Sequence, residues 1–372
     1  MESNPFLISG YISPDYFCDR EKETSTITEA LLNRRHLTIF SPRRMGKTGL
    51  ISHLFYLGSK KKLFLPVYAD IMATTSLQEF VETLGKAVFT AVAKNETTLK
   101  KILKKLALLR PKITVDEFTG APSVTISVAP GQETVSSLEL IFDYFRTQDK
   151  QFVLAIDEFQ QVTEYPEKNV EALLRTFIQQ SSNVTIIFSG SRKHILTGIF
   201  STPDRPFYNS TQLLELGKIY SESYSDFIRE RLVSPSRSIT DGAIALILEA
   251  TSLHTFYVQF LCNRLYSAFR KIDKDQVKTM LLRIINENEP VYGGYINLLT
   301  TLQFRVLRAV ATNGGVRNPT SSEFLDNHSL GAASSVSLAV KSLEDKGFIS
   351  YNNQAYILND QFFSQWLIYK VG

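Results

Sequence analysis

The sequence contains few cysteines. Its 372 residues include only Cys18 and Cys262, which lie far apart in the chain. Neither lies in a C-x-x-C or similar spacing, so the sequence predicts no disulfide framework and no zinc module. We expect both side chains to be reduced thiols.

Long apolar runs are also missing. No run approaches the roughly 18 to 20 residues that a membrane-spanning helix needs. The opening stretch, MESNPFLISGYISPDYF, has no basic segment followed by an apolar one, which argues against a secretory signal peptide. We therefore expect a cytoplasmic protein that does not act on a membrane.

The excess of charge of one sign is small. The formal net charge is +4, from 41 Lys and Arg against 37 Asp and Glu. Such a balance permits contact with nucleic acid but does not predict it. By contrast, 44% of the residues are hydrophobic and 25 are Phe, which is enough apolar material for folded cores and excludes a disordered chain. A chain of this length has room for two or three domains.

Strand and helix patterns alternate in the first part of the chain. Short apolar runs predict strands at 37–40, 63–69, 152–158 and 183–191, and helical spacing predicts helices at 48–57, 76–93, 98–110 and 138–145. Residues 112–131 alternate in polarity and contain a Gly-Ala-Pro turn, which predicts an inserted β-hairpin. Continuous apolar strands separated by helices are typical of an α/β fold, in which helices cover both faces of a parallel sheet.

The pattern changes after about residue 220. Strand patterns stop there, and a series of helical patterns, the last of them at 276–289, predicts a helical lid. From residue 301, three helical segments are followed by a two-strand hairpin, which is the order of a winged helix, and a serine caps the second of these helices. We expect a P-loop α/β core at 1–218 with inserted helices and a hairpin around 76–131, a lid at 219–298, and a winged-helix domain at 299–372.

One segment of the sequence has the residues of a phosphate-binding site. FSPRRMGKTGL, residues 40–50, follows a predicted strand and opens a predicted helix, as a phosphate-binding loop (Walker A) does. Gly46, Lys47 and Thr48 fit the pattern G-x-x-x-x-G-K-[ST], and Ser41 takes the place of the first glycine. That glycine serves the geometry of the turn and does not bind phosphate through a side chain. We therefore expect the small Ser41, stiffened by Pro42, to be tolerated.

A second segment strengthens this interpretation. FVLAIDE, residues 152–158, is an apolar strand that ends in Asp157 and Glu158, which is the Walker B pattern. Parallel strands present their carboxyl ends at one edge of a sheet, so the two segments would meet there. The alternative is a chance loop with an unrelated acidic strand end.

These residue types suit a nucleoside triphosphate with Mg²⁺. Backbone N–H groups of residues 43–49, at the start of a helix, would surround the phosphates. Lys47 would supply charge to the β- and γ-phosphates, and Thr48 and Asp157 would bind or orient Mg²⁺. Glu158 would polarise the attacking water, so Glu158 and Lys47 are the catalytic candidates. The expected nucleotide-binding residues are Pro42, Arg43, Arg44, Met45, Gly46, Lys47, Thr48 and Gly49.

The segment PRRMGKT, followed by an apolar strand and Asp-Glu, resembles the AAA+-like ATPases of the STAND clade, in particular archaeal and bacterial ATPases with a PRRxGKT loop. Softer matches such as YFCDRE (16–21) and PFYNSTQLLEL extend the resemblance over most of the chain. It implies that Ser189 or Ser191 senses the γ-phosphate or the attacking water, although a plain strand-end turn is the alternative. Arg192 could stabilise the transferring phosphate or be an ordinary surface arginine.

Together, the motifs and the resemblance predict an ATP-binding protein and a slow Mg-dependent ATPase. It would bind ATP or ADP and act as a nucleotide-controlled conformational switch, with a protein partner or as an oligomer. Two alternatives stay open: a DNA-binding regulator in which nucleotide is a structural ligand, and a non-hydrolysing protein-interaction module. Residues 301–372 hold six Lys and Arg against five Asp and Glu, which is a weak balance for binding DNA.

Overall fold

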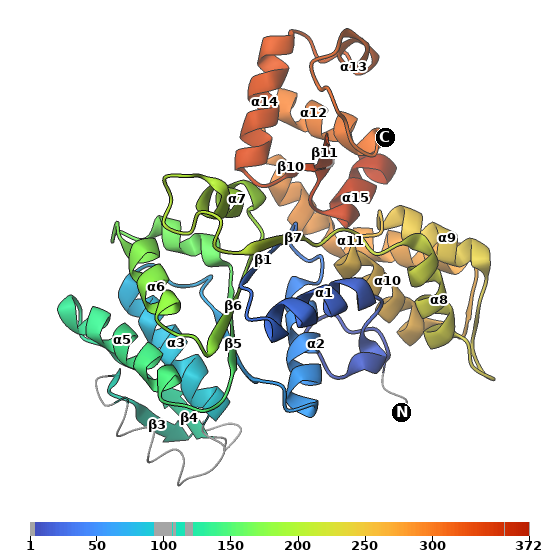
Figure 1. Cartoon of the computed structure of the whole chain (residues 1–372). Helices are drawn as coiled ribbons and strands as arrows, with labels where there is room; N and C mark the ends of the chain where they lie inside the picture. Colours follow the sequence, from blue (N-terminus) through green and yellow to red (C-terminus); the bar gives the residue numbers. More distant parts are fainter. Residues whose placement is uncertain (1–3, 93–105, 107–108, 116–121, 353, 372) are drawn as a thin grey trace. The chain divides into compact units, whose positions relative to one another are not determined.

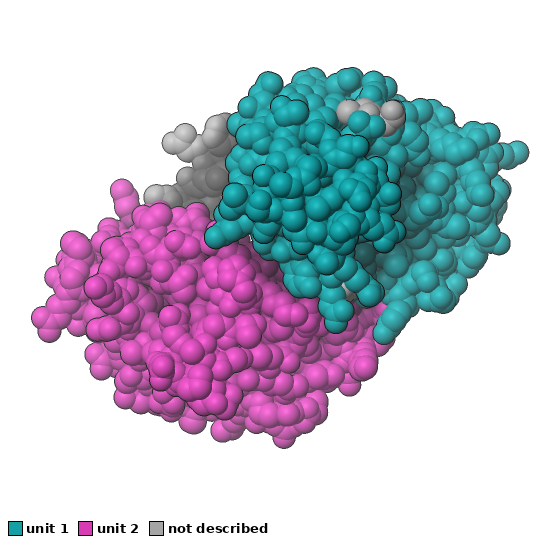
Figure 2. Space-filling view, turned by 90° about the horizontal axis from the view of Figure 1, so that it is seen from above, with its two compact units in different colours: residues 1–9, 218–372 teal, residues 10–217 magenta. Residues whose placement is uncertain are grey.

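The computed structural model describes residues 4–92, 106, 109–115, 122–352 and 354–371. The chain forms two compact units, residues 10–217 and residues 1–9 together with 218–372 (Figure 1, Figure 2). Each unit is described by itself below.

The unit of residues 10–217 is built on a five-stranded parallel sheet with the strand order β2-β5-β6-β1-β7. Its strands are β1 (Leu37–Phe40), β2 (Leu65–Asp70), β5 (Phe152–Asp157), β6 (Val184–Gly190) and β7 (Gln212–Glu215). The helices in its described residues are α1 (Glu21–Leu32), α2 (Lys47–Lys60), α3 (Leu77–Val92), α5 (Gln132–Arg146), α6 (Val170–Gln179) and α7 (Lys193–Ser201), with short 3-10 turns at Pro14–Tyr16 and Phe159–Glu164. The predicted α/β class is confirmed, although the short edge strand β7 leaves no clear pattern in the sequence.

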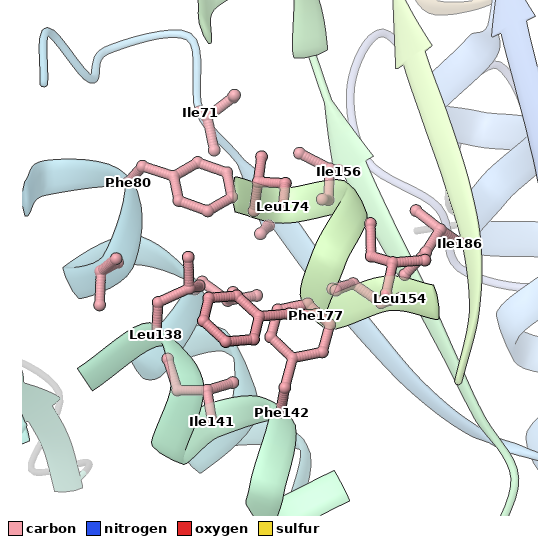
Figure 3. Packing of buried hydrophobic residues seen from close by; sticks show 14 of the residues in the cluster. Ile71, Phe80, Leu138, Ile141, Phe142, Leu154, Ile156, Leu174, Phe177 and Ile186 are labelled. Atoms are coloured by element: carbon pink, nitrogen blue, oxygen red, sulfur yellow. The ribbon is translucent and has the colours of Figure 1, made fainter. Parts of the chain in front are cut away.

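The sheet separates two apolar cores. Phe152, Leu154 and Ile156 of β5 belong to the cluster that also contains residues of α3, α5 and α6 (Figure 3). Val153 and Ala155 belong to the other cluster, with residues of α1 and α2. Successive side chains of a strand point to opposite faces, so a strand covered on both sides must be apolar throughout. This explains why every residue of β5 is buried.

The predicted hairpin is also present. Strands β3 (Lys112–Val115) and β4 (Pro122–Thr125) pair in antiparallel register as a separate two-stranded sheet. The helix predicted at 98–110 lies outside the described residues, apart from 106, 109 and 110.

The second unit begins with helices α8 (Ser221–Leu232), α9 (Asp241–Ala250), α10 (Thr255–Ala268) and α11 (Lys274–Ile296). The expectation that strands stop in this region is wrong at one place. Strands β8 (Ser238–Ile239) and β9 (Lys271–Ile272) form a parallel pair. Each has two residues, which is too short to produce a recognisable alternation. The start of the chain joins this unit, since the ring of Phe6 packs edge-on against Phe227 at 5.9 Å between centroids.

The winged-helix order predicted from residue 301 is confirmed. Helices α12 (Thr301–Thr312), α13 (Ser322–Asn327) and α14 (Ala333–Asp345) precede the antiparallel strands β10 (Ile349–Asn352) and β11 (Ala355–Leu358). The Ser321 side chain caps α13 by accepting the N–H of Phe324. None of the helices in the described ranges is both long and apolar enough to cross a bilayer.

Two helices of this unit exceed the predictions. The pattern for α11 stops at residue 289, but the helix continues through Pro290, and α15 (Gln361–Val371) follows the hairpin. The two extensions contact each other. The ring of Tyr292 lies 5.1 Å from that of Phe363 and 5.9 Å from that of Trp366. Because this aromatic packing stabilises both segments, it outweighs the hydrogen bond that Pro290 cannot donate.

Candidate functional site

The loop between β1 and α2 has the form that its motif predicts. Gly46 caps α2 in a left-handed conformation, with φ 95° and ψ 15°, which glycine adopts without strain. Ser41 is 2% exposed, and its hydroxyl donates to the backbone oxygen of Pro42 at 3.0 Å. The loop therefore closes with a serine at the position of the usual first glycine.

Lys47 opens α2 and lies inside the loop. It is 6% exposed, and its Nζ donates to the backbone oxygen of Ser41 at 3.2 Å. Burial lowers the pKa of Lys47, while the charges of Glu158 and Asp157 oppose this change. Of the other predicted loop residues, Met45 is buried, Pro42, Gly46 and Gly49 are half-buried, and Arg43, Arg44 and Thr48 are exposed.

Asp157 ends β5 and accepts four hydrogen bonds. Thr48 Oγ1 and Tyr68 OH donate to its Oδ2 at 3.0 and 2.6 Å. Ser189 Oγ and the backbone N–H of Glu158 donate to its Oδ1 at 2.6 and 3.0 Å. Asp157 is 4% exposed, so this carboxylate is held from both sides in one orientation.

Glu158 follows in a left-handed conformation, with φ 56° and ψ 41°. Two donors reach its Oε2: Ser191 Oγ at 2.8 Å and Gln160 Nε2. Gln160 is 3% exposed, so one of the two donors to the Glu158 carboxylate is a buried amide.

The structure thus brings together most of the predicted site. The carboxyl edge of the sheet holds the four central residues, Lys47, Thr48, Asp157 and Glu158. Ser189 at the end of β6 donates to the Asp157 carboxylate, and Ser191 just after β6 donates to the Glu158 carboxylate. Arg192, the third sensor candidate, instead forms an exposed ion pair with Glu164 at 3.1 Å.

Three residues near the carboxylates escape the sequence patterns. Tyr68 and Asp70 lie on β2, and Gln160 lies in the turn after β5. Asp70 pairs in register with Asp157. Burial raises the pKa of Asp70, the N–H of Met72 counteracts this, and the charges of Asp157 and Glu158 raise it further. The sequence places Tyr68 near the carboxyl end of the strand predicted at 63–69 and Asp70 directly after it, but it does not indicate which strand lies beside this one.

The residues present fit a bound Mg²⁺. The Thr48 hydroxyl and the Asp157 carboxylate are hard oxygen donors, and they lie within 3.0 Å of each other beside the start of a helix. Magnesium in phosphate sites takes one or two such protein donors and completes its shell with phosphate oxygens and water.

Two parts of the chain match family models. Residues 17–200 match the model of an ATPase domain predominantly from Archaea, and residues 290–369 match a probable winged helix domain. No curated protein matches the chain. The first match spans the loop, β5 and the end of β6, and so it supports an ATPase domain that contains these segments.

Several solved structures share the fold. The Walker-type ATPase PABY2304 of Pyrococcus abyssi has a TM-score of 0.66 and 15% identity, and covers 98% of this chain and 99% of its own. The ORC2 protein of Aeropyrum pernix has a TM-score of 0.56 and 11% identity, with coverages of 99% and 98%. The ORC1 protein of the same organism, in complex with DNA, has a TM-score of 0.52 and 12% identity, with coverages of 96% and 94%. At these identities the likeness shows the fold.

Proposed function

We propose that the chain binds ATP or ADP with Mg²⁺ on residues 42–49 and hydrolyses ATP slowly. One observation carries the proposal. Thr48 Oγ1 of the loop donates to Asp157 Oδ2 at the end of β5, although 109 positions separate the two residues in the chain. The two halves of the predicted magnesium site thus lie within hydrogen-bond distance beside the start of α2, which supports the proposal. The match to an ATPase domain supports the same proposal.

In this proposal each side chain has one role. Lys47 binds the phosphates, Thr48 and Asp157 hold Mg²⁺, and Glu158 takes a proton from the attacking water. Bound Mg²⁺ would neutralise the charge that develops on the phosphate oxygens. Ser189 then orients Asp157, because it donates to the oxygen opposite the one that faces Thr48.

Calorimetry with ADP and with a non-hydrolysable ATP analogue, each with Mg²⁺, tests the binding half. A lost charge-assisted hydrogen bond costs about 1.5–3 kcal/mol, so Lys47→Ala should weaken binding at least about 10- to 150-fold. Lys60→Ala, an exposed lysine at the other end of α2, is the matched control. A folded wild-type protein that binds neither nucleotide would end the proposal. Turnover that disappears in Glu158→Gln would exclude the non-hydrolysing interaction module.

We further propose that this is a STAND-type ATPase in which residues 219–298 form a lid and residues 299–372 a winged-helix domain, both rearranged by nucleotide. The segment PRRMGKT and the division of the chain into two compact units support this. Limited proteolysis and small-angle scattering in ATP and in ADP test the switch. Identical digestion patterns and identical scattering profiles in the two nucleotides would contradict it.

A second candidate function is DNA binding through the winged helix. The match at residues 290–369 and the fold shared with an ORC1 protein solved in complex with DNA favour it. A salt-dependent shift of duplex DNA that Lys341→Glu abolishes would support this function. If duplex DNA showed no shift even at low salt, DNA binding through the winged helix would be excluded.

A further inference from the structure

A pocket in the C-terminal part of the second unit is lined by residues of α14, of the hairpin β10–β11 and of the loop after α12. Figure 1 labels these helices and strands. We call the hairpin the wing and this site the α14–wing pocket. Its lining includes Val340 and Lys341 of α14, Arg317 of the loop, and Tyr351 and Tyr356 of the wing.

Backbone pairing builds the pocket. Val316 N–H donates to Tyr356 O at 2.9 Å, and Tyr356 N–H donates to Val316 O at 2.8 Å, which fastens the loop to the wing. Arg317, the next residue, is therefore fixed beside the wing. Tyr351 pairs with Tyr356 across the two strands, and their rings lie 4.9 Å apart. The wing thus presents a double aromatic wall.

The opposite wall is one face of α14. Ser337, Lys341 and Glu344 recur at helical spacing, so their side chains lie on the same side of the helix. Val340 beneath them is 4% exposed, which makes the floor apolar. The lining therefore combines an apolar floor and aromatic wall with two cations, one carboxylate and hydroxyl groups.

The charges of this pocket are available to a ligand. Within the described part of this unit, the ion pairs are those of Arg229, Arg264, Arg283 and Lys370, and none involves a lining residue. Two exposed cations beside two tyrosines match a ligand that carries a phosphate next to a planar ring. A carboxylate at the same site can accept a hydrogen bond from an amino group on that ring.

We propose that the α14–wing pocket binds one unpaired nucleotide, with its phosphate on Arg317 and Lys341 and its base against Tyr351 and Tyr356. Glu344 accepts from the exocyclic amino group of the base, so the pocket prefers cytosine to thymine. The nucleotide is a free molecule or one position of a single strand. None of the lining residues belongs to the loop at 42–49, and the proposal does not depend on the proposed ATPase activity.

Fluorescence anisotropy at low salt tests the proposal, with labelled single strands of deoxycytidine or thymidine, a duplex of the same length, and unlabelled CMP as competitor. The protein is the full chain carrying Lys47→Ala, so that binding at the ATP loop does not contribute. The deoxycytidine strand should bind more tightly than the thymidine strand. Tyr351→Ala should weaken its binding about 5- to 150-fold. Arg317→Ala should also lower the salt dependence by about 0.7 per phosphate contact.

Two variants serve as matched controls. Tyr369 is 53% exposed against 54% for Tyr351, and Lys278 is an exposed cation on α11. Tyr369→Ala and Lys278→Ala should bind as the parent does, and Glu344→Gln should lose the preference for cytosine. If CMP competes with the labelled strand, the ligand of the pocket is a free nucleotide. If the strand binds and CMP does not compete, the ligand is one nucleotide of a single strand. Failure of both to bind, or binding that Tyr351→Ala and Arg317→Ala leave unchanged, would overturn the proposal.

Discussion

Gly190 ends β6 against the side chain that supports Glu158. A Cβ atom added at Gly190 would lie 1.9 Å from Gln160 Oε1 and 3.0 Å from Leu196 Cδ1. Gln160 is buried, and its Nε2 donates to Glu158 Oε2. We therefore predict that Gly190→Ala displaces the Gln160 amide and breaks its hydrogen bond to Glu158.

The size of the effect follows from this geometry. An ordinary contact needs 3.4 Å where the added Cβ has 1.9 Å, so the amide must retreat by about 1.5 Å. Overpacking of this kind costs typically about 1–3 kcal/mol, and the lost hydrogen bond adds about 1 kcal/mol. In a Gln160→Ala background the amide is absent, and the nearest remaining contact given for the added Cβ is the milder one with Leu196 Cδ1 at 3.0 Å. The cost of Gly190→Ala should then fall below about 1 kcal/mol.

Chemical denaturation of the wild type, both single variants and the double variant forms a double-mutant cycle. We expect a coupling of about 1–3 kcal/mol between the two positions, which is the difference between the two costs of Gly190→Ala. Gly198→Ala is the control, because nothing lies within 4 Å of an added Cβ there, and alanine should be neutral or stabilising in that helix. Equal costs of Gly190→Ala with and without the Gln160 side chain would refute the reasoning.

Three further predictions concern the same unit. Glu158→Gln should lower the rate of phosphate release about 10²- to 10⁴-fold and leave the affinity for ADP nearly unchanged. If the rate and the affinity fell by the same factor, the role of Glu158 as a base would be contradicted. Tyr68→Phe removes the 2.6 Å bond to Asp157 and should raise the Mg²⁺ concentration for half-maximal turnover about 5- to 30-fold, whereas an unchanged requirement would assign Tyr68 to packing alone. Burial lowers the pKa of His36, so the folded protein binds fewer protons than the unfolded chain; stability should be full above about pH 6.5 and decline as the pH falls. In chemical denaturation at a series of pH values, His36→Asn should reduce this decline in the free energy of unfolding, and the control His194→Asn, at an exposed histidine, should not. If the free energies of wild type and His36→Asn changed in parallel with pH, the assignment to His36 would be contradicted.

The meeting of Thr48 and Asp157 could be predicted because it depends only on topology. Asp157 ends β5, and Thr48 lies at the start of the helix that follows β1. The carboxyl ends of these parallel strands share one edge of the sheet. Tyr68 could not be assigned in the same way, because its contact depends on strand order and register. In the sheet β2 pairs with β5, and Tyr68 lies opposite Ala155. No feature of the segment LFLPVYAD indicates which strand lies beside it.

The misjudged helix end at Pro290 has a different cause. Local sequence favours a stop there, because proline removes a backbone donor. The helix continues because of α15, which lies more than seventy positions further along the chain. Its residues Phe363 and Trp366 pack against Tyr292. Such a contact is invisible to any pattern read over a short window.

Asp157 at the end of β5 and Glu158 directly after it differ in how firmly they are held, and this difference suits two different tasks. Asp157 accepts donors on both oxygens, including hydroxyl groups from α2, β2 and β6, so its carboxylate has one orientation. That rigidity suits a group that positions a metal ion. Glu158 receives both of its side-chain donors on the single oxygen Oε2 and has a positive φ of 56°. A carboxylate fastened through one oxygen can turn about it, which suits a group that must accept a proton from water and release it again. The pair Asp-Glu thus places a carboxylate held through both oxygens next to one held through a single oxygen, and the N–H of Glu158 links them by donating to Asp157 Oδ1.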